Sequence, residues 1–341
     1  MAGQRSDAEQ ATQNLTAAVG VEQRLAVSHG PFPCIRAARR FDASRHVVFD
    51  IAGIRVGWIR RSDLARLDVW RHVFDIDDAR VALRAEFDTV DARTRVLGEV
   101  IGALAAEGCI PGWRDETYAI RNHFDDAPLA YIERAASRFF GTQTFAVHLN
   151  GVVFGRAGTS EGDVIGVSDV IGAGDALRSA GGQLSDAARE TTRMWIARRS
   201  LQKATDPGML DNLVGGGIGW GYGIEETLIK ECWEESGIPD SLARRAVRGG
   251  TIHVLQEIEE GTQAEQLFIF DLDVGADFEP QNQDGEVADH RLAAIDDVLQ
   301  WIQQGRMTVD ASLAALDWMS RHGALGEVAR AELAALSNAP V

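Results

Sequence analysis

The sequence predicts two consecutive domains, an α+β domain followed by a larger domain in which strands and helices alternate. Three observations lead to this prediction. The chain has 341 residues, and at about 150 residues per domain this length suggests two domains. Its composition is 45% hydrophobic, which suffices for a sizeable core. Strand-like and helix-like periodicities alternate along the chain, which then ends in amphipathic helices.

The segment 1–140 has the pattern of a compact α+β unit. Residues 46–61, HVVFDIAGIRVGWIRR, predict two strands around a glycine-containing turn. Helical spacing follows over 62–108, and Gly108 is a suitable stop for the last of these helices. A loop, a short extended piece and a further helical stretch over 128–141, which ends at Gly141, complete the unit.

A second domain is predicted over 141–305, with C-terminal helices over 306–341. Residues 144–155, TFAVHLNGVVFG, predict a pair of strands with a tight turn at Asn150-Gly151. The stretch 156–187 is rich in Gly, Ser, Ala and Asp, so we expect a flexible insertion. Further strands are predicted at 192–200 and 267–274, and helices at 293–304 and 312–323.

Charge and composition exclude several classes of function. The net charge of −17 argues against nucleic-acid binding and against an anionic membrane surface. No apolar run approaches the roughly 20 residues that span a bilayer, and the first residues lack the apolar core of a signal peptide. The three cysteines are too few and too far apart for a disulfide framework or a zinc cluster. We therefore expect a cytoplasmic protein.

The segment 213–238, LVGGGIGWGYGIEETLIKECWEESGI, carries the chemistry. A glycine-rich loop precedes a helix-forming run, and Glu231, Glu234 and Glu235 share one face of that helix at i, i+3 and i+4. Crowded carboxylates repel one another, and a divalent cation relieves the repulsion. Hard oxygen ligands suit Mg²⁺ or Mn²⁺. The glycine loop allows close approach of a phosphorylated substrate at Gly217, and the carbonyl of Gly216 is a further candidate metal ligand.

This segment resembles the box of the Nudix hydrolases, G-x5-E-x7-R-E-U-x-E-E-x-G-U, where U is apolar. Gly216 matches the first glycine, and 230–238 match the second half of the box, with Lys230 in place of arginine. The register departs at the first glutamate, whose position is Tyr222; Glu226 lies four residues before Lys230, and we expect the two to pair. The resemblance implies an α/β/α sandwich with a mixed sheet.

Residues 194–218 and 278–292 are similar to the Nudix branch related to the domain fused to fungal thiamine pyrophosphokinase. That branch has an N-terminal domain of its own, and GIRVGWIRR and GWRDETYAIR resemble it. The resemblance implies Mg²⁺-dependent hydrolysis of a small-molecule diphosphate, namely thiamine diphosphate or its damaged oxy and oxo analogues, to the monophosphate.

Other residues are candidates for contact with the substrate. Arg198, Arg199 and Lys203 precede the glycine loop and suit phosphate oxygens, although adjacent arginines on a strand face opposite sides. Trp220 suits either stacking on a heterocycle or packing against the helix. Glu286 lies in QDGEV, which resembles the loop that supplies a further carboxylate in many Nudix enzymes.

In the catalytic roles so assigned, Glu231, Glu234 and Glu235 bind the metal, and Glu235 or Glu286 takes the proton. One alternative substrate class is an oxidised nucleoside diphosphate or a nucleotide sugar. An alternative of another kind is a non-catalytic Nudix-like sensor module. For the N-terminal domain two roles stay open: it shapes the substrate pocket, or it mediates a homodimer.

Overall fold

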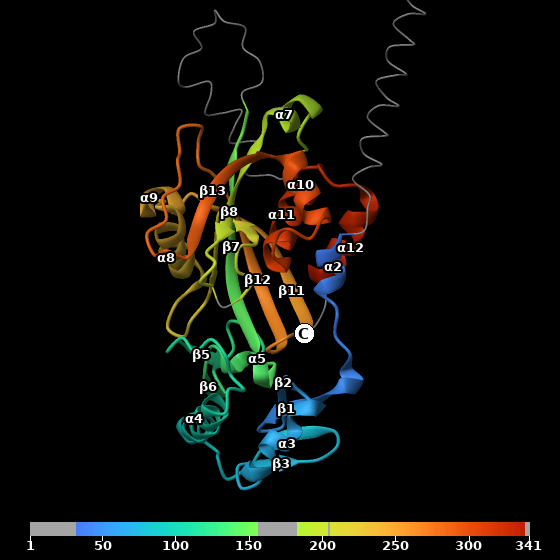
Figure 1. Cartoon of the computed structure of the whole chain (residues 1–341), viewed down its shortest axis with the longest axis vertical. Helices are drawn as coiled ribbons and strands as arrows, with labels where there is room; N and C mark the ends of the chain where they lie inside the picture. The colour runs from blue at the N-terminus through green and yellow to red at the C-terminus, as the bar shows by residue number, and fades with distance from the viewer. Residues whose placement is uncertain (1–31, 156–182, 204, 338–341) are drawn as a thin grey trace, which may run out of the picture.

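The structure is a computed structural model that describes residues 32–155, 183–203 and 205–337. It contains a smaller N-terminal domain and a larger domain built on a long central sheet (Figure 1). The elements of the N-terminal part are α2 (Pro33–Ala37), η1 (Ala43–Arg45), β1 (His46–Ile51), β2 (Ile54–Arg60), η2 (Arg61–Asp63), α3 (Leu64–Leu67), η3 (Asp68–Trp70), β3 (Phe74–Ile76), β4 (Arg80–Leu83), α4 (Val90–Ala106), β5 (Thr117–Ile120), β6 (Ala130–Glu133) and α5 (Ala136–Phe140).

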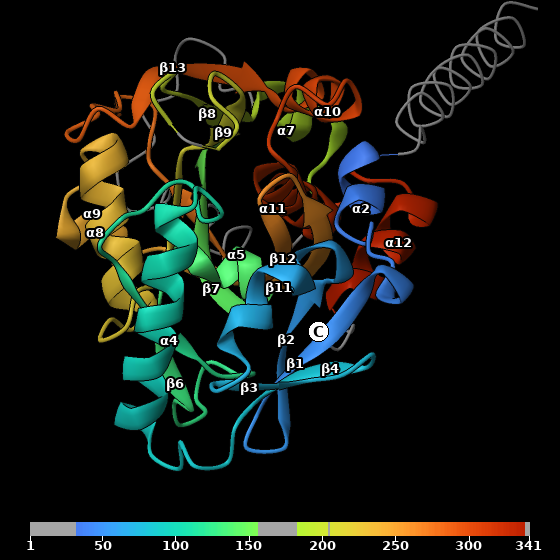
Figure 2. The same ribbon diagram turned by 60° about the horizontal axis from the view of Figure 1, so that its bottom comes forward.

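The N-terminal domain joins a four-stranded sheet, in the order β2-β1-β4-β3, to the small β5-β6 ribbon and helix α4 (Figure 2). The predicted hairpin at 46–61 is confirmed: its turn places Ala52 and Gly53 at positive φ, the geometry that matches the twist of paired strands. Helix α4 begins after Thr89, whose hydroxyl accepts the Ala92 N–H. This domain therefore has the predicted α+β character and a core of its own.

The helical prediction for 62–108 is only partly correct. Between η2 and α4 the chain forms single helical turns and then the strands β3 and β4. Strand β4 pairs in parallel with β1, which lies some thirty residues earlier, so its formation depends on a long-range contact. The predicted helix at 128–141 is likewise divided, because β6 occupies its first half and α5 its second.

The larger domain is an α/β/α sandwich around a mixed sheet, as predicted. The strand order is β11-β12-β7-β8-β13, with β10 added to β7 and β9 to β8. Among the strand pairs described in this sheet, only β7–β12 is parallel. Its elements are β7 (Gln143–Val153), α7 (Asp186–Thr191), β8 (Arg193–Arg199), β9 (Leu210–Asn212), β10 (Val214–Gly217), α8 (Ile224–Ser236), α9 (Asp240–Ala243), β11 (Val247–Ile258), β12 (Gly261–Asp273), β13 (Val287–Ala294), α10 (Ile295–Gln303), α11 (Val309–Arg321) and α12 (Glu327–Ser337).

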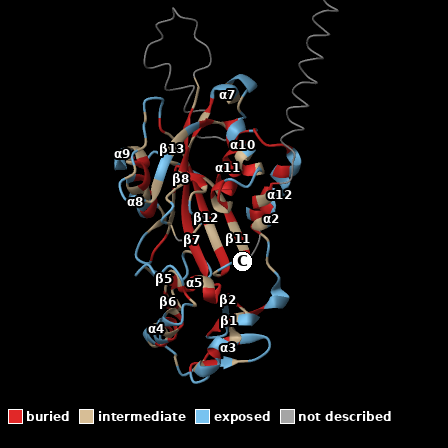
Figure 3. Ribbon diagram, viewed as in Figure 1, coloured by how far each residue is buried: buried red, intermediate tan, exposed pale blue. Residues whose placement is uncertain are grey.

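Alternation along β7 shows how the two helical layers are placed. Phe145, Val147 and Leu149 pack into the core beneath α8 and α9, whereas Ala146 and Val152 pack into the core beneath α10, α11 and α12. The strand is buried along its whole length, and most of β12 is buried as well (Figure 3). The site helix α8 thus rests on a rigid, doubly covered sheet.

The predicted tight turn at Asn150-Gly151 is wrong, because β7 runs straight through these residues. Asn150 is fully buried, and its amide donates to Asp271 Oδ1 and to the Ala314 carbonyl. A β-carbon at Gly151 would overlap the Leu213 side chain. Both residues therefore serve close packing inside the sandwich rather than a turn.

The two ends of the described chain meet in the larger domain. Helix α2 packs against α10, α11 and α12, and the predicted C-terminal helices α11 and α12 belong to the same core. Most of the predicted insertion at 156–187 lies outside the described residues; its last two residues begin α7. Among the helices described, none has the length and apolar character needed to cross a membrane.

Candidate active site

The glycine-rich segment folds into strand β10 followed by a loop and helix α8. The helix begins after Gly223, and Glu226 at N3 accepts the Gly223 N–H, which is the glutamate half of a capping box. It ends at Gly237, which has the left-handed φ of 67° that favours glycine. Leu228 and Cys232 are buried beneath it. The predicted helix and its stop are confirmed, and the carboxylates lie on the side of α8 that faces β10.

Two of the predicted metal-binding carboxylates touch the glycine strand. The Glu231 carboxyl group lies against Gly216, where a β-carbon would overlap it. Glu235 is buried, and its Oε2 accepts the Gly215 N–H at 2.8 Å. Glu234 lies further out on the helix and is partly exposed. The absence of side chains at Gly215 and Gly216 is what lets α8 bring these acids onto the strand.

Both lysines of the chain lie among these acids. Lys230 Nζ lies 2.6 Å from Glu234 Oε2 and 3.3 Å from Glu231 Oε1. The expected pairing of Lys230 with Glu226 is therefore wrong. Glu226 accepts the Gly223 N–H at the start of the helix, one turn before Lys230, so the lysine pairs with the carboxylates on its own turn and on the next.

Burial changes the acidity of the two inner carboxyl groups. It raises the pKa of Glu235 to about 8; the Lys203 ammonium opposes this shift and the charge of Glu231 adds to it. Burial also raises the pKa of Glu231, against the influence of Lys230. Two acids with raised pKa values, side by side on one helix, form a site where a cation is favoured.

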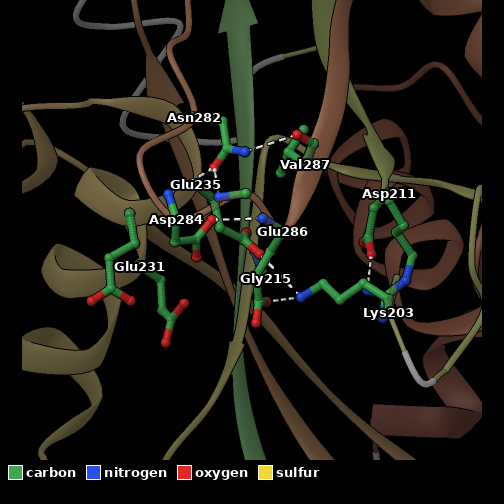
Figure 4. A network of polar contacts seen from close by, with 12 residues as sticks. Lys203, Asp211, Gly215, Glu231, Glu235, Asn282, Asp284, Glu286 and Val287 are labelled. Carbon is green, nitrogen blue, oxygen red and sulfur yellow. Dashed lines mark hydrogen bonds and ion pairs between the residues drawn. The ribbon is translucent and has the colours of Figure 1, made fainter. Parts of the chain in front are cut away.

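Lys203 reaches the same site from the loop after β8. Its ammonium group forms an ion pair with Glu286 Oε2 and lies 3.9 Å from Glu235 Oε1. Figure 4 shows the lysine extending toward these carboxylates from the side opposite α8. The Glu286 loop is fixed by Asp284, which accepts the Glu286 N–H, and by Asn282. The structure thus brings Glu286 and Lys203 together near α8.

The two predicted phosphate-binding arginines have partners in the protein. Arg198 lies 3.1 Å from Asp289 on β13. Arg199 is mostly buried; it donates to Asp211 at 2.7 Å and twice to the Thr205 carbonyl. As adjacent residues of a strand they face opposite sides. Lys203, in contrast, lies 3.9 Å from the box carboxylate of Glu235.

Gly217 and Trp220, the other predicted substrate contacts, face the N-terminal domain. A β-carbon at Gly217 would overlap the Tyr118 hydroxyl group. The Trp220 ring packs on Tyr131, with 4.8 Å between centroids, and its backbone N–H donates to the Thr117 carbonyl. The tryptophan is still 43% exposed, so packing against the N-terminal domain uses only part of its ring.

Comparison with known proteins identifies the two parts of the chain. Residues 179–314 match the family described as NUDIX domain, and residues 31–144 match a family described as a domain of unknown function, DUF4743. The match to the NUDIX family lies within the larger domain and includes β10 and α8. The box is the segment from Gly216 to Ile238, with the displaced glutamate described above.

Three relatives match this chain over most of its length. The chain is 34% identical to Nudix hydrolase 24, chloroplastic, of Arabidopsis thaliana over 79% of its length and 65% of that protein. It is 34% identical to Nudix hydrolase 20, chloroplastic, of the same plant over 72% and 57%. It is 24% identical to the uncharacterized protein YJR142W of Saccharomyces cerevisiae over 80% and 75%. The chain thus spans about three fifths of the length of the two plant relatives.

The donor set of the Nudix site fits a hard divalent cation. It consists of carboxylate oxygens on one helix face above a glycine strand, where a β-carbon at Gly216 would fill the space that Glu231 uses. Within the described residues no three acidic, histidine or cysteine side chains already converge as a metal cluster. The lysines pair with these acids instead, so a metal would have to compete with Lys230 and Lys203 for them.

Several side chains of the N-terminal domain that border this site were not among the predicted site residues. Arg114 contacts Glu286, while Tyr118 and Arg134 lie over Gly217. A signal was present, since GWRDETYAIR contains two of these residues and stood out by its resemblance to the branch. Nothing in the local pattern indicated that this stretch lies against the Nudix box.

Proposed function

We propose that this chain is a Nudix hydrolase that cleaves a diphosphate linkage in a small molecule with the help of Mg²⁺ or Mn²⁺. The observation that carries the proposal is the placement of Glu231 and Glu235 on the Gly215–Gly216 strand, with Lys203 beside them. The relatives named Nudix hydrolase, at 34% identity, support the same activity.

In this proposal each residue of the site has a distinct role. Glu231, Glu234 and Glu235, with the carbonyl of Gly216, would hold the metal. When bound, the metal supplies a Lewis acid that polarises the phosphoryl group and acidifies the attacking water. Lys203 offsets negative charge on the phosphate oxygens, because its ammonium group is already at the carboxylates. A carboxylate, Glu235 or Glu286, accepts the proton.

We further propose that the substrate is thiamine diphosphate or its oxy and oxo analogues. The similarity of residues 194–218 and 278–292 to the thiamine-related branch supports this. The test is product analysis with Mg²⁺ over a panel of thiamine diphosphate, oxythiamine diphosphate, ADP-ribose, an oxidised nucleoside diphosphate and NADH. Selective formation of a thiamine monophosphate is the expected result. Turnover of nucleotides alone would keep the Nudix chemistry and exclude the thiamine substrate.

The variant Glu235→Gln tests the site itself. The amide oxygen still accepts the Gly215 N–H, and glutamine has nearly the same shape as glutamate, so we expect the fold to be kept. Turnover should fall by about 10²- to 10⁴-fold, the usual effect of losing a positioned acid or base. Glu225→Gln is the matched control, because Glu225 is exposed on the same helix and pairs with Arg244. Wild-type turnover by Glu235→Gln, or no Mg²⁺ binding by the wild type, would favour a non-catalytic sensor.

A further inference from the structure

The loop that leads into β5 of the N-terminal domain lies at the rim of the Nudix site. Arg114 Nη1 in this loop is 3.5 Å from Glu286 Oε1. Glu286 also pairs with Lys203, which in turn lies 3.9 Å from Glu235. An alternating row of charges therefore connects the N-terminal domain to the buried carboxylate of α8.

The charge of Arg114 contributes little to the stability of the fold. Its side chain is 36% exposed, and its contact with Glu286 is long and shared with Lys203. Exposed ion pairs of this kind contribute little free energy, so the guanidinium can exchange Glu286 for another anion at small cost. Arg199 differs in this respect, because it is mostly buried and tied to Asp211 and the Thr205 carbonyl.

The backbone beneath Arg114 is held firmly. The Glu133 carboxylate on β6 accepts the N–H of Arg114 at 2.9 Å and the N–H of Glu116 at 3.2 Å. Between them Asp115 has a left-handed φ of 56°, a conformation that non-glycine residues adopt mainly where surrounding contacts impose it. An anchored backbone with a free side chain lowers the entropy lost when a ligand binds.

We propose that Arg114 is a substrate-binding residue, contributed by the N-terminal domain, that binds phosphate oxygens of the diphosphate in the Nudix site, and that Glu133 positions it. This rests on the proposed function. Guanidinium suits the task because its planar fork donates two parallel hydrogen bonds to a phosphate group. On binding, Arg114 leaves Glu286, and Lys203 keeps that carboxylate neutralised.

The test measures binding apart from turnover. The probe is imidodiphosphate with Mg²⁺, titrated by calorimetry into the full chain. Arg114→Gln should weaken its binding by about 10- to 100-fold, as expected for loss of a charge-assisted hydrogen bond. The affinity of Arg114→Lys should lie between those of the wild type and Arg114→Gln, because lysine keeps the charge but lacks the planar guanidinium fork. Arg71→Ala is the control: it removes an exposed arginine of the same domain that pairs with Asp68, and it should bind as the wild type does.

The role of Glu133 is tested with a double-mutant cycle. Glu133→Gln should weaken probe binding, and Arg114→Gln/Glu133→Gln should be no weaker than Arg114→Gln alone, because Glu133 acts through the arginine. With a hydrolysed substrate, both single variants should raise KM more than they lower kcat. A structural defect would instead lower the melting temperature and add to the effect of Arg114→Gln.

The outcomes separate this inference from the proposed function. Probe binding by the wild type that depends on Arg114, without turnover of any diphosphate, would support the inference and remove the hydrolase assignment. Turnover by the wild type, with unchanged probe affinity and KM in Arg114→Gln, would overturn the inference alone. Absence of probe binding by the wild type would overturn it too. If Arg114→Gln does not fold, Arg114→Lys decides on the same criteria.

Discussion

Lysine is the rarest cation of this chain, and both copies, Lys203 and Lys230, pair with carboxylates of the candidate site. A lysine ammonium is a point charge on a flexible stem, whereas guanidinium is a rigid fork. Lys230 is 45% exposed, so its pairs with Glu231 and Glu234 are individually weak. These properties suit a side chain that neutralises the carboxylates in the absence of a metal and can be displaced from them when a metal binds.

Glu226 occupies the place of the displaced box glutamate, and its contacts indicate a structural role. Its carboxylate accepts the Gly223 N–H at 3.0 Å. Glu226→Ala should lower the free energy of unfolding by about 1 kcal/mol, the usual cost of a lost cap, and leave kcat within roughly twofold. Urea denaturation and steady-state kinetics measure the two effects.

The control for this variant is Glu225→Ala. Glu225 lies in the same first turn, so its removal costs the same favourable interaction with the helix dipole but no capping bond. A large loss of turnover in Glu226→Ala with unchanged stability would show instead that this carboxylate takes part in the chemistry.

At the scale of elements, local signals predicted some segments correctly and failed at others for a common reason. Helix α8 was predictable because its stop and its spacing are local features of the sequence. Asn150-Gly151 has equally good local turn chemistry, yet these residues continue β7 because Asp271, Ala314 and Leu213, from distant segments, surround them. Tertiary contacts of this kind leave no signal in a single sequence window.

The residues of the candidate site also fall into those that the sequence predicts and those that it does not. The carboxylates of the box follow from the spacing on one helix, and Glu286 followed from its resemblance. Arg114 and Arg134 did not, since they reach the site only when the β5–β6 ribbon packs on the loop after β10. Residues contributed by another domain are fixed by docking, which composition and periodicity do not encode.

The contact between α11 and β12 carries an unusual pair of acids. Gln263 Nε2 donates both to Asp310 Oδ2 at 3.0 Å and to Glu265 Oε2 at 2.6 Å. Among the described residues the other oxygen of Asp310 has no hydrogen-bond partner. Burial, and next the charge of Glu265, raise the pKa of Asp310 to about 8. This carboxyl group is therefore held protonated near neutral pH.

The pH dependence of stability follows from the sign of this shift. In the unfolded chain an aspartate has a pKa of about 3.9, so the native state binds the extra proton. The contribution of the protonated Asp310 side chain to the free energy of unfolding is complete below about pH 4. It is lost as the pH rises through about 8. Asp310→Asn should thus be more stable than the wild type at pH 9, by at least about 1 kcal/mol, and closer to it at pH 5.

Chemical denaturation at the two pH values measures this difference. Asp297→Asn is the control, because Asp297 is exposed in the first turn of α10 and loses the same interaction with a helix N-terminus. Its effect should not grow between pH 5 and pH 9. An equal gain or loss for Asp310→Asn at both pH values would contradict the assigned protonation.

At the scale of the whole molecule, the chain ties its two domains together at both ends of the smaller one. Helix α2 packs on the larger domain. After it, the carbonyl groups of Ala38 and Arg40 accept the N–H groups of Leu255 and Glu257 on the edge strand β11. Only then does the chain form the N-terminal sheet, and it returns through α5 to β7. Arg60 adds bonds to the carbonyls of Glu259 and Gly261. These bonds hold the N-terminal domain against β11 and the β11–β12 turn, whereas Arg114 contacts Glu286 in the loop before β13, at the opposite edge of the sheet.

Binding of metal should stabilise this whole assembly, because the site exists only in the native state. A cation at 100 times its Kd adds about 2.7 kcal/mol, which corresponds to a rise in melting temperature of several degrees for a protein of this size. We expect Mg²⁺ to produce this rise, EDTA to reverse it, and Glu231→Gln/Glu235→Gln to lack it. The chain carries a net charge of −17, so any salt also relieves its self-repulsion. NaCl at matched ionic strength is therefore the necessary control, and a rise of equal size in NaCl would show screening rather than a metal site.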